Sequence, residues 1–218
     1  DLSGHVAIEE NGISFDVDYI DGQKTGYYLD QKYNRRAVMN LARGRRVLDC
    51  FTHTGAFALH AAKGGASHVT AVDVSAYALE RARDNATRNG LDDVEFVCAD
   101  VFELLTARDE RGDRSDDFII LDPPAFTKSH ATARSAYRGY KEINLKAMRL
   151  LPRGGYLATC SCSHFMKDDM FRQMLVEASH DANVSLRQIE ARQQSPDHPI
   201  LLDVPETNYL KFYLFQVV

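Results

Sequence analysis

The first residues of the chain alternate between apolar and polar side chains. In "GISFDVDYI" the apolar Ile13, Phe15, Val17 and Tyr19 are separated by polar residues, and "ENG" before this run is a turn signal. An alternation with a period of two places the apolar residues on one face of a strand. The pattern therefore predicts a small antiparallel hairpin over residues 5–20.

From residue 33 onward, short apolar runs alternate with helical stretches, which is typical of βα units stacked around a mostly parallel sheet. The segment "RQQSPDHPILLDVPETN" is too short for a crossover helix with its loops, so the strand after it is expected to enter antiparallel. The predicted fold class is α/β, a doubly wound, Rossmann-like sheet preceded by the hairpin. Seven strands are predicted, at residues 46–51, 68–74, 94–100, 117–122, 155–161, 184–191 and 209–218.

Three helices have clear boundaries in the sequence. The stretch "GAFALHAAKGG" ends on glycines, "SAYALERARDNATRNG" begins at a Ser cap and stops at Asn-Gly, and "YKEINLKAMRLL" precedes a Pro. We expect two regions, an N-terminal hairpin extension over residues 1–32 and the main domain over residues 33–218.

Composition narrows the class of protein. A chain of 218 residues with 44% hydrophobic content suits one large core. No apolar run is long enough for a membrane helix and no signal peptide is visible, so a soluble, cytoplasmic protein is expected. The start at Asp1, in place of Met, suggests residues further upstream.

The four cysteines, Cys50, Cys98, Cys160 and Cys162, lie in or beside apolar runs without the spacing of a disulfide framework or a zinc finger. Reduced thiols and no metal site are therefore expected.

The net charge of −5 argues against a surface that binds nucleic acid everywhere. Local basic stretches, "QKYNRR", "ARGRR" and "TKSHATARSAYRGYK", fit RNA contact or a solvated surface equally well.

Ligands of open α/β sheets bind outside the carboxyl ends of the strands. The loop after the first of these strands offers only Gly55, without the glycine-rich fingerprint of a nicotinamide enzyme. Carboxylates instead follow three consecutive strands: Asp49 with Gly55 suits an amino-acid tail, Asp73 suits ribose hydroxyls, and Asp100 with Val101 suits adenine. A single such Asp is more often a helix cap or turn former, but three in order favour S-adenosylmethionine as the cofactor.

The loop "DPPAF" follows the fourth of these strands. Its prolines, Pro123 and Pro124, fix the backbone, so that Asp122 and a backbone carbonyl can hold an exocyclic amine of a base while Phe126 stacks on the ring. The alternative is a rigid loop that only punctuates a strand.

Several motifs together resemble a known family. They are "KTGYYLDQKYNRR", "LDCFTHTGAFALHAAKGGASHVTAVDVS", "NATRNG", "CADVF", "LDPPAFTKS", "RGYKEIN", "SCS", and "DHP" with "PETNYLK". From about residue 12 to the end, the chain is similar to the methyltransferase region of bacterial large-subunit ribosomal RNA cytosine carbon-5 methyltransferases, class I enzymes that carry an N-terminal PUA domain. Two departures stand out: no PUA domain is included, and His53 replaces the usual Tyr.

The resemblance implies a set of site residues. Lys24, Gly26, Tyr28, Asp30, Gln31 and Arg35 would lie over the methionine end of the cofactor. The remaining cofactor residues would be Asp49, Thr54, Gly55, Asp73, Val74, Asp100, Val101 and Asp122. The RNA would meet Pro123, Pro124, Phe126, Lys128, Tyr140 and Lys141. The catalytic residues would be Cys162, which matches the family's "SCS" cysteine, and Asp122.

Carbon-5 of cytosine is a poor nucleophile, so its methylation needs a thiolate that first adds to carbon-6. Cys162 fits this role, although a free cysteine also serves as a small apolar residue, as expected for Cys160. Asp122 would stabilise the protonated N3. A base must later remove the carbon-5 proton, and His164 and His198 are candidates, each also suited to an ordinary surface position.

Other functions remain open. An enzyme that methylates a guanine or adenine nitrogen uses a similar loop and needs no cysteine, and a non-catalytic RNA-binding module would keep the fold without the cofactor. The expected partner is ribosomal RNA. The sequence leaves open the target nucleotide and the oligomeric state, with a homodimer as one option.

Overall fold

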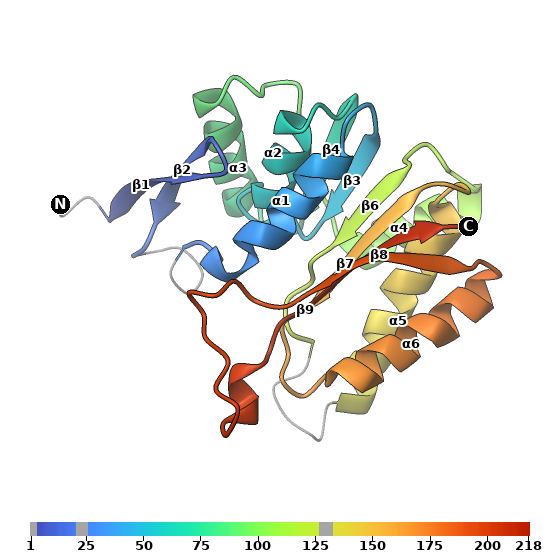
Figure 1. Cartoon of the computed structure of the whole chain (residues 1–218). Helices are drawn as coiled ribbons and strands as arrows, with labels where there is room; N and C mark the ends of the chain where they lie inside the picture. The colour runs from blue at the N-terminus through green and yellow to red at the C-terminus, as the bar shows by residue number, and fades with distance from the viewer. Residues whose placement is uncertain (1–3, 21–25, 127–132) are drawn as a thin grey trace. The chain divides into compact units, whose positions relative to one another are not determined.

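The computed structural model describes residues 4–20, 26–126 and 133–218 (Figure 1). The predicted site residues Lys24 and Lys128 lie outside these ranges. The described residues belong to two compact units, one formed by residues 1–99 with 195–197, the other by residues 100–194 with 198–218. The predicted division at residue 32 stays a prediction.

The N-terminal hairpin is confirmed. Strands β1 (His5–Glu10) and β2 (Ile13–Asp18) pair antiparallel. The predicted buried face is correct for Ile13, Phe15 and Val17, whereas Tyr19 follows the end of β2 and is 43% exposed. The alternation therefore stops one apolar residue earlier than predicted, because the strand itself ends at Asp18.

The first unit continues with three parallel strands in the order β5-β4-β3. These are β3 (Arg46–Cys50), β4 (His68–Asp73) and β5 (Glu95–Cys98). The short 3-10 helix η1 (Leu29–Gln31) leads into α1 (Lys32–Leu41), and α2 (Ala56–Lys63) and α3 (Ala76–Arg88) connect the strands. The hairpin docks on α3, where the amides of Ser14 and Asp16 donate hydrogen bonds to the side chains of Asn89 and Asn85, both 2.8 Å long.

The second unit holds the other four strands in the order β6-β7-β9-β8. They are β6 (Phe118–Leu121), β7 (Tyr156–Ser161), β8 (Leu186–Arg192) and β9 (Lys211–Val217). Strands β6 and β7 are parallel, while β9 runs antiparallel to both β7 and β8, as predicted for the last strand. All seven predicted strands are therefore present.

Three α-helices accompany these strands: α4 (Val101–Arg111), α5 (Ala133–Leu150) and α6 (Asp168–Ala182), with a 3-10 turn η3 (Pro205–Thr207) before β9. Helix α5 packs against β6 and β7, and α6 packs along α5 (Figure 1). The apolar core of this unit includes the fully buried Phe118, Tyr140, Phe171 and Phe212.

The helix predictions were partly correct. Helices α2 and α3 match, and the Ser75 hydroxyl accepts the capping hydrogen bond from the amide of Ala78. Helix α5 begins at Ala133, well before the predicted Tyr140, and no boundaries were predicted for α1, α4 and α6. Within the described ranges, no helix is long and apolar enough to cross a membrane.

Candidate functional site

The carboxylate of Asp73 organises the end of β4. Its Oδ2 accepts a hydrogen bond from the amide of His53 and its Oδ1 accepts one from the amide of Ser75, at 2.8 and 2.9 Å. Both bonds come from backbone donors, so the carboxylate has little freedom to turn. Asp73 is therefore fixed in orientation between the loop after β3 and the start of α3.

The loop after β3 makes a tight turn. Phe51, His53 and Gly55 all have positive φ angles, of 64°, 53° and 83°. A Cβ at Gly55 would lie 3.0 Å from the Cβ of Ala82, so both backbone conformation and space require glycine there. Thr54, another predicted cofactor residue, lies half-buried within the same turn.

Asp49 lies beneath this turn. Its side chain is fully buried, and its Oδ2 accepts a 2.6 Å hydrogen bond from the hydroxyl of Thr52. The structure thus places Asp49 where it supports the loop. Its predicted contact with the amino-acid tail of a cofactor would have to be made from the side of the loop that Asp49 supports.

Val74 follows Asp73 and is 72% exposed. Adenosine offers an apolar ring face and two ribose hydroxyls, which need an apolar surface and a hydrogen-bond acceptor side by side. The neighbours Val74 and Asp73 supply both. This end of β4 therefore fits the adenosine part of S-adenosylmethionine.

The predicted cofactor residue Arg35 is only 2% exposed. Its Nε and one terminal nitrogen donate to the two carboxylate oxygens of Glu10, at 2.6 and 2.9 Å, and the same terminal nitrogen donates to the backbone carbonyl of Tyr28 at 2.7 Å. Gln31 is also buried and accepts a 2.6 Å hydrogen bond from Asn34. Arg35 thus ties β1 to α1 and to the segment that carries Tyr28.

His60 lies beside this ion pair. Burial and the charge of Arg35 lower the pKa of His60 to about 4, so the ring is neutral at pH 7. The surroundings assign the tautomer: Nδ1–H donates to the carbonyl of Ala56 at 2.7 Å, and Nε2 accepts from the side-chain amide of Asn11 at 3.0 Å. Burial likewise raises the pKa of Tyr27, whose hydroxyl donates to Glu10.

His53, which departs from the resembling family, has its ring edge against Tyr28, with 5.4 Å between ring centroids. Burial lowers its pKa, against the raising effect of the Asp73 charge. His53 therefore makes an aromatic packing contact at this position.

In the second unit, Asp100 caps helix α4. Its Oδ1 accepts hydrogen bonds from the amides of Phe102 and Glu103, at 2.8 and 3.1 Å. Asp100 is exposed, whereas the next residue, Val101, is 3% exposed. Asp100 therefore has the capping role that the sequence also allowed. Its contact with adenine stays a prediction.

The "DPPAF" loop leaves β6 with Asp122 half-buried, Pro123 buried and Pro124 exposed. The ring of Phe126 is half-buried and packs against Tyr140 and Phe102, with ring centroids 4.6 and 5.6 Å apart. Phe126 is thus held from one side by aromatic neighbours, and its stacking on a base stays a prediction.

Cys162 follows the end of β7 and is half-buried, whereas Cys160, within β7, is fully buried. All four cysteines are free in the structure. The hydroxyl of Ser161 donates to the Tyr140 hydroxyl at 3.2 Å. Burial raises the pKa of Tyr140, and the charges of Cys162 and Asp122 raise it further. A hydrogen bond therefore joins the Tyr140 hydroxyl to Ser161, the residue before Cys162.

The two residues of α5 that were predicted to contact RNA, Tyr140 and Lys141, are not fully exposed. Tyr140 is fully buried, with its ring edge on Phe171, so it lies in the core and not on the surface. Lys141 is half-buried and forms ion pairs with Asp181 and Glu177 of α6, at 2.9 and 3.4 Å. An RNA phosphate would have to compete with these carboxylates for Lys141.

The candidate bases differ in exposure. His164 is exposed, with its ring 3.9 Å from that of Phe165, and His198 is half-buried. Sequence reasoning missed Lys211, the first residue of β9, which is 5% exposed. A single cation inside the apolar run "YLKFYLFQVV" was the available signal.

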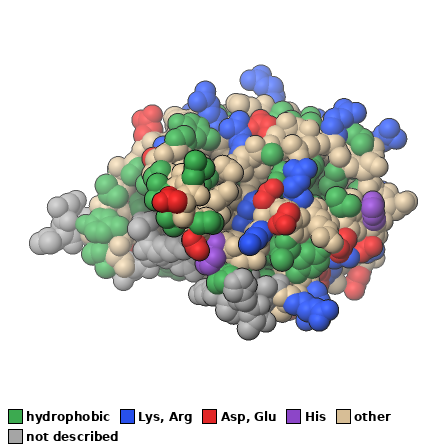
Figure 2. All heavy atoms as spheres, turned by 60° about the horizontal axis from the view of Figure 1, so that its bottom comes forward, with side chains coloured by type: hydrophobic (Ala, Val, Ile, Leu, Met, Phe, Trp, Pro, Cys, Tyr) green, Lys and Arg blue, Asp and Glu red, His purple; other side chains and the backbone are tan. Residues whose placement is uncertain are grey.

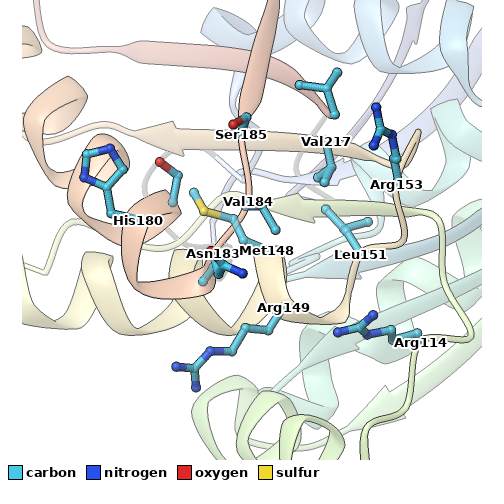
Figure 3. Close-up of a pocket in the computed structure, with 13 residues that line it drawn as sticks. Arg114, Met148, Arg149, Leu151, Arg153, His180, Asn183, Val184, Ser185 and Val217 are labelled. Carbon is cyan, nitrogen blue, oxygen red and sulfur yellow. The ribbon is translucent and has the colours of Figure 1, made fainter.

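The second unit has a cavity of about 620 Å³ near the starts of β6 and β7 (Figure 3). Arg114 precedes β6 and Arg153 precedes β7, and both line it together with Arg149 and His180. Asp122 and Cys162 follow the other ends of the same two strands. The cavity is therefore separate from the predicted catalytic side chains.

In the view of Figure 2, basic side chains are scattered among acidic ones. Lys32 pairs with Asp197 at 2.7 Å, while Arg36, Arg43 and Arg46 are exposed. Among residues 4–20, 26–126 and 133–218, no group of three or more His, Cys, Asp and Glu is placed to hold a metal ion.

Comparison with known proteins adds the family. Residues 3–216 match the family model described as S-adenosylmethionine-dependent methyltransferase. The chain is 47% identical over 208 residues to "Ribosomal RNA large subunit methyltransferase I" of Shewanella denitrificans, and 48% identical to the protein of that name from Photobacterium profundum. Each match covers 94% of this chain and 52% of the relative, so the chain spans about half the length of these relatives.

Solved structures show the same fold. The protein SMU.776, solved in complex with SAH, superposes on 100% of this chain and 57% of its own with a TM-score of 0.88 and 26% identity. Trm5b from Pyrococcus abyssi, at 18% identity, covers 100% of this chain and 57% of its own, with a TM-score of 0.73, and supports the fold alone. The predicted class, a Rossmann-like α/β fold with a seven-stranded, mostly parallel sheet, is confirmed, as is S-adenosylmethionine as the family's cofactor. The chain therefore belongs to the family of S-adenosylmethionine-dependent methyltransferases.

Proposed function

We propose that this protein methylates carbon-5 of a cytosine in large-subunit ribosomal RNA, with Cys162 as the nucleophile. The relatives named above support the RNA substrate. The observation that carries the chemistry is the placement of Cys162 and Asp122 at the same edge of the sheet in the second unit. These two side chains follow β6 and β7, which are adjacent parallel strands.

The residues proposed to hold the cofactor are those that the sequence predicted. In the first unit, Asp73 accepts from the ribose hydroxyls and Val74 covers one face of adenine, next to the Gly55 turn. Asp100, Val101 and Asp122, in the second unit, stay predicted cofactor residues. The bound cofactor supplies an electrophilic methyl group on a sulfonium.

Cys162 acts first on the cytosine. Its thiolate forms a bond to carbon-6, and the π electrons of the C5=C6 bond shift toward carbon-5 and N3. Carbon-5 thereby becomes nucleophilic enough to take the methyl group that the cofactor would supply, with the S–CH3 bond broken and S-adenosylhomocysteine as the leaving group. A base then removes the carbon-5 proton, the C5=C6 bond returns, and the thiolate leaves carbon-6, so that the enzyme is regenerated.

Asp122 and Tyr140 serve this addition in different ways. Asp122, half-buried at the end of β6, stabilises the positive charge of cytosine protonated at N3. Tyr140 is fully buried, so its hydroxyl acts as a positioning group that holds Ser161 at the end of β7.

Covalent trapping tests this function. Wild type, Cys162→Ala and Cys98→Ser are incubated with S-adenosylmethionine and ribosomal RNA transcripts that contain 5-fluorocytidine, whose fluorine blocks the release of the adduct. A complex that survives denaturing electrophoresis is expected for wild type and should be absent for Cys162→Ala. The control variant Cys98→Ser, which removes an exposed thiol, should still form the complex.

Two other outcomes would change the function. Methylation of ordinary RNA by both wild type and Cys162→Ala, without an adduct, would identify a base nitrogen as the acceptor and make Cys162 a packing residue. Failure to bind S-adenosylmethionine in calorimetry would favour a non-catalytic RNA-binding module.

A further inference from the structure

Lys211 is placed beside the peptide that carries the proposed nucleophile. In the pairing of β7 with β9 it stands opposite Ser161, the residue before Cys162. It is 5% exposed, which is rare for a lysine. Because β9 comes from the end of the chain, this neighbourhood depends on strand pairing.

The ammonium of Lys211 is held by backbone oxygens. Nζ donates to the carbonyl of Ser163 at 2.6 Å and to the carbonyl of Tyr209 at 2.8 Å. An ammonium has three N–H donors, so these two carbonyls fix its position and leave a third donor. Ser163 follows Cys162 directly, and the lysine therefore also anchors the backbone next to the thiol.

A buried cation is costly unless an anion compensates it. Burial lowers the pKa of Lys211 to about 8, while the charges of Cys162 and Asp168 oppose this effect. Asp168 is exposed at the start of α6 and accepts a hydrogen bond from the Tyr213 hydroxyl. Of these two groups, only Cys162 directly follows the strand that pairs with Lys211.

We propose that Lys211 is a positioning residue for the methyl transfer, whose ammonium stabilises the thiolate form of Cys162 and fixes the backbone beside it. This inference rests on the proposed function, because it assigns Lys211 to the same reaction. Thiols beside a lysine lose their proton more readily than isolated ones, which have a pKa of about 8.5. The ammonium of Lys211 would then favour loss of the proton from the Cys162 thiol.

Alkylation of the thiol tests the coupling without RNA or cofactor. Rates of iodoacetamide labelling are followed between pH 5 and 10 by peptide mass spectrometry, in wild type and in Lys211→Met, which keeps the length of the side chain but removes its charge. The midpoint for Cys162 is expected to rise by about one pH unit in the variant, as for a lost neighbouring charge. Cys98, an exposed thiol in the same samples, should keep its midpoint.

An unchanged Cys162 midpoint in folded Lys211→Met would overturn the proposal. Should that variant not fold, the reciprocal measurement decides: coupling between two sites is mutual, so removal of the thiolate must lower the pKa of Lys211. The ¹³C NMR titration of the lysine side chain in wild type and Cys162→Ala reports it, and identical curves would contradict the proposal.

The result is independent of the trapping experiment. A trapped RNA adduct with an unshifted thiol midpoint would leave the proposed function standing and remove Lys211 from it. A shifted midpoint without any adduct would leave the lysine–thiol coupling intact and remove the cytosine chemistry.

Discussion

The backbone amide of His53 donates a 2.8 Å hydrogen bond to Oδ2 of Asp73. This bond connects the turn after β3 with the end of β4, and the second oxygen of the same carboxylate accepts from Ser75. The orientation of the acid is therefore set by two backbone donors before any ligand arrives. Such preorganisation reduces the free energy needed to order a binding site.

Replacement of Asp73 by Asn should weaken binding of S-adenosylhomocysteine by tenfold or more. The amide has one acceptor oxygen, so it cannot accept from both His53 and Ser75, and it loses the charge that favours ribose hydroxyls. Isothermal titration calorimetry measures the change. Asp93→Asn, at an exposed carboxylate, is the control and should bind like wild type. Equal affinity of both variants would exclude Asp73 from the cofactor site.

Gly55→Ala should destabilise the protein more than Gly90→Ala. Both glycines have positive φ, 83° and 64°, so each substitution introduces backbone strain of about 1 kcal/mol. Only at Gly55 would the new Cβ lie 3.0 Å from Ala82, whereas nothing lies within 4 Å at Gly90. The difference in unfolding free energy, measured in urea, isolates the steric contribution, and equal losses would show that the turn relaxes.

Arg35→Met should lower the free energy of unfolding by about 3–5 kcal/mol, because it leaves the buried carboxylate of Glu10 without its bidentate partner. Arg36→Met, at the next and exposed position, should change it by less than about 0.5 kcal/mol. Chemical denaturation compares the two. A similarly small effect of both substitutions would mean that the attraction between Arg35 and Glu10 barely exceeds the cost of removing their charges from water.

Stability should fall as the pH drops from 6.5 to about 4. His60 has a pKa of about 4 in the folded state and about 6.5 when unfolded, so in this window the unfolded state binds more protons. The free energy of unfolding therefore rises with pH there. Urea titrations at several pH values should show a shallower slope for His60→Gln than for wild type. Equal slopes for wild type and His60→Gln would mean that carboxylates, and not His60, cause the pH dependence of the free energy of unfolding.

The sequence predicted the features that depend on local pattern. Apolar runs located all seven strands, and the cap at Ser75 located the start of α3. It could not separate a ligand from a helix cap at Asp100, because a carboxylate after a strand serves both purposes, and α4 was consequently given no boundary.

Pairings between distant residues were not predictable. Glu10 and Arg35 meet only because the hairpin folds against α1, and nothing local marks either as a partner of the other. Tyr140 belongs to a family motif and was predicted to touch RNA, but its position on α5 turns it toward the core. Lys211 reaches the neighbourhood of Cys162 through the antiparallel pairing of β9 with β7.

That antiparallel pairing also sets an order of events during synthesis. Strand β7 has β6 and β9 as its neighbours, and β9 (Lys211–Val217) is synthesised after the segment that carries Cys162. Until those residues emerge, Lys211 is missing and one edge of β7 is open. The thiol therefore gains its final environment only when translation has reached the end of this region.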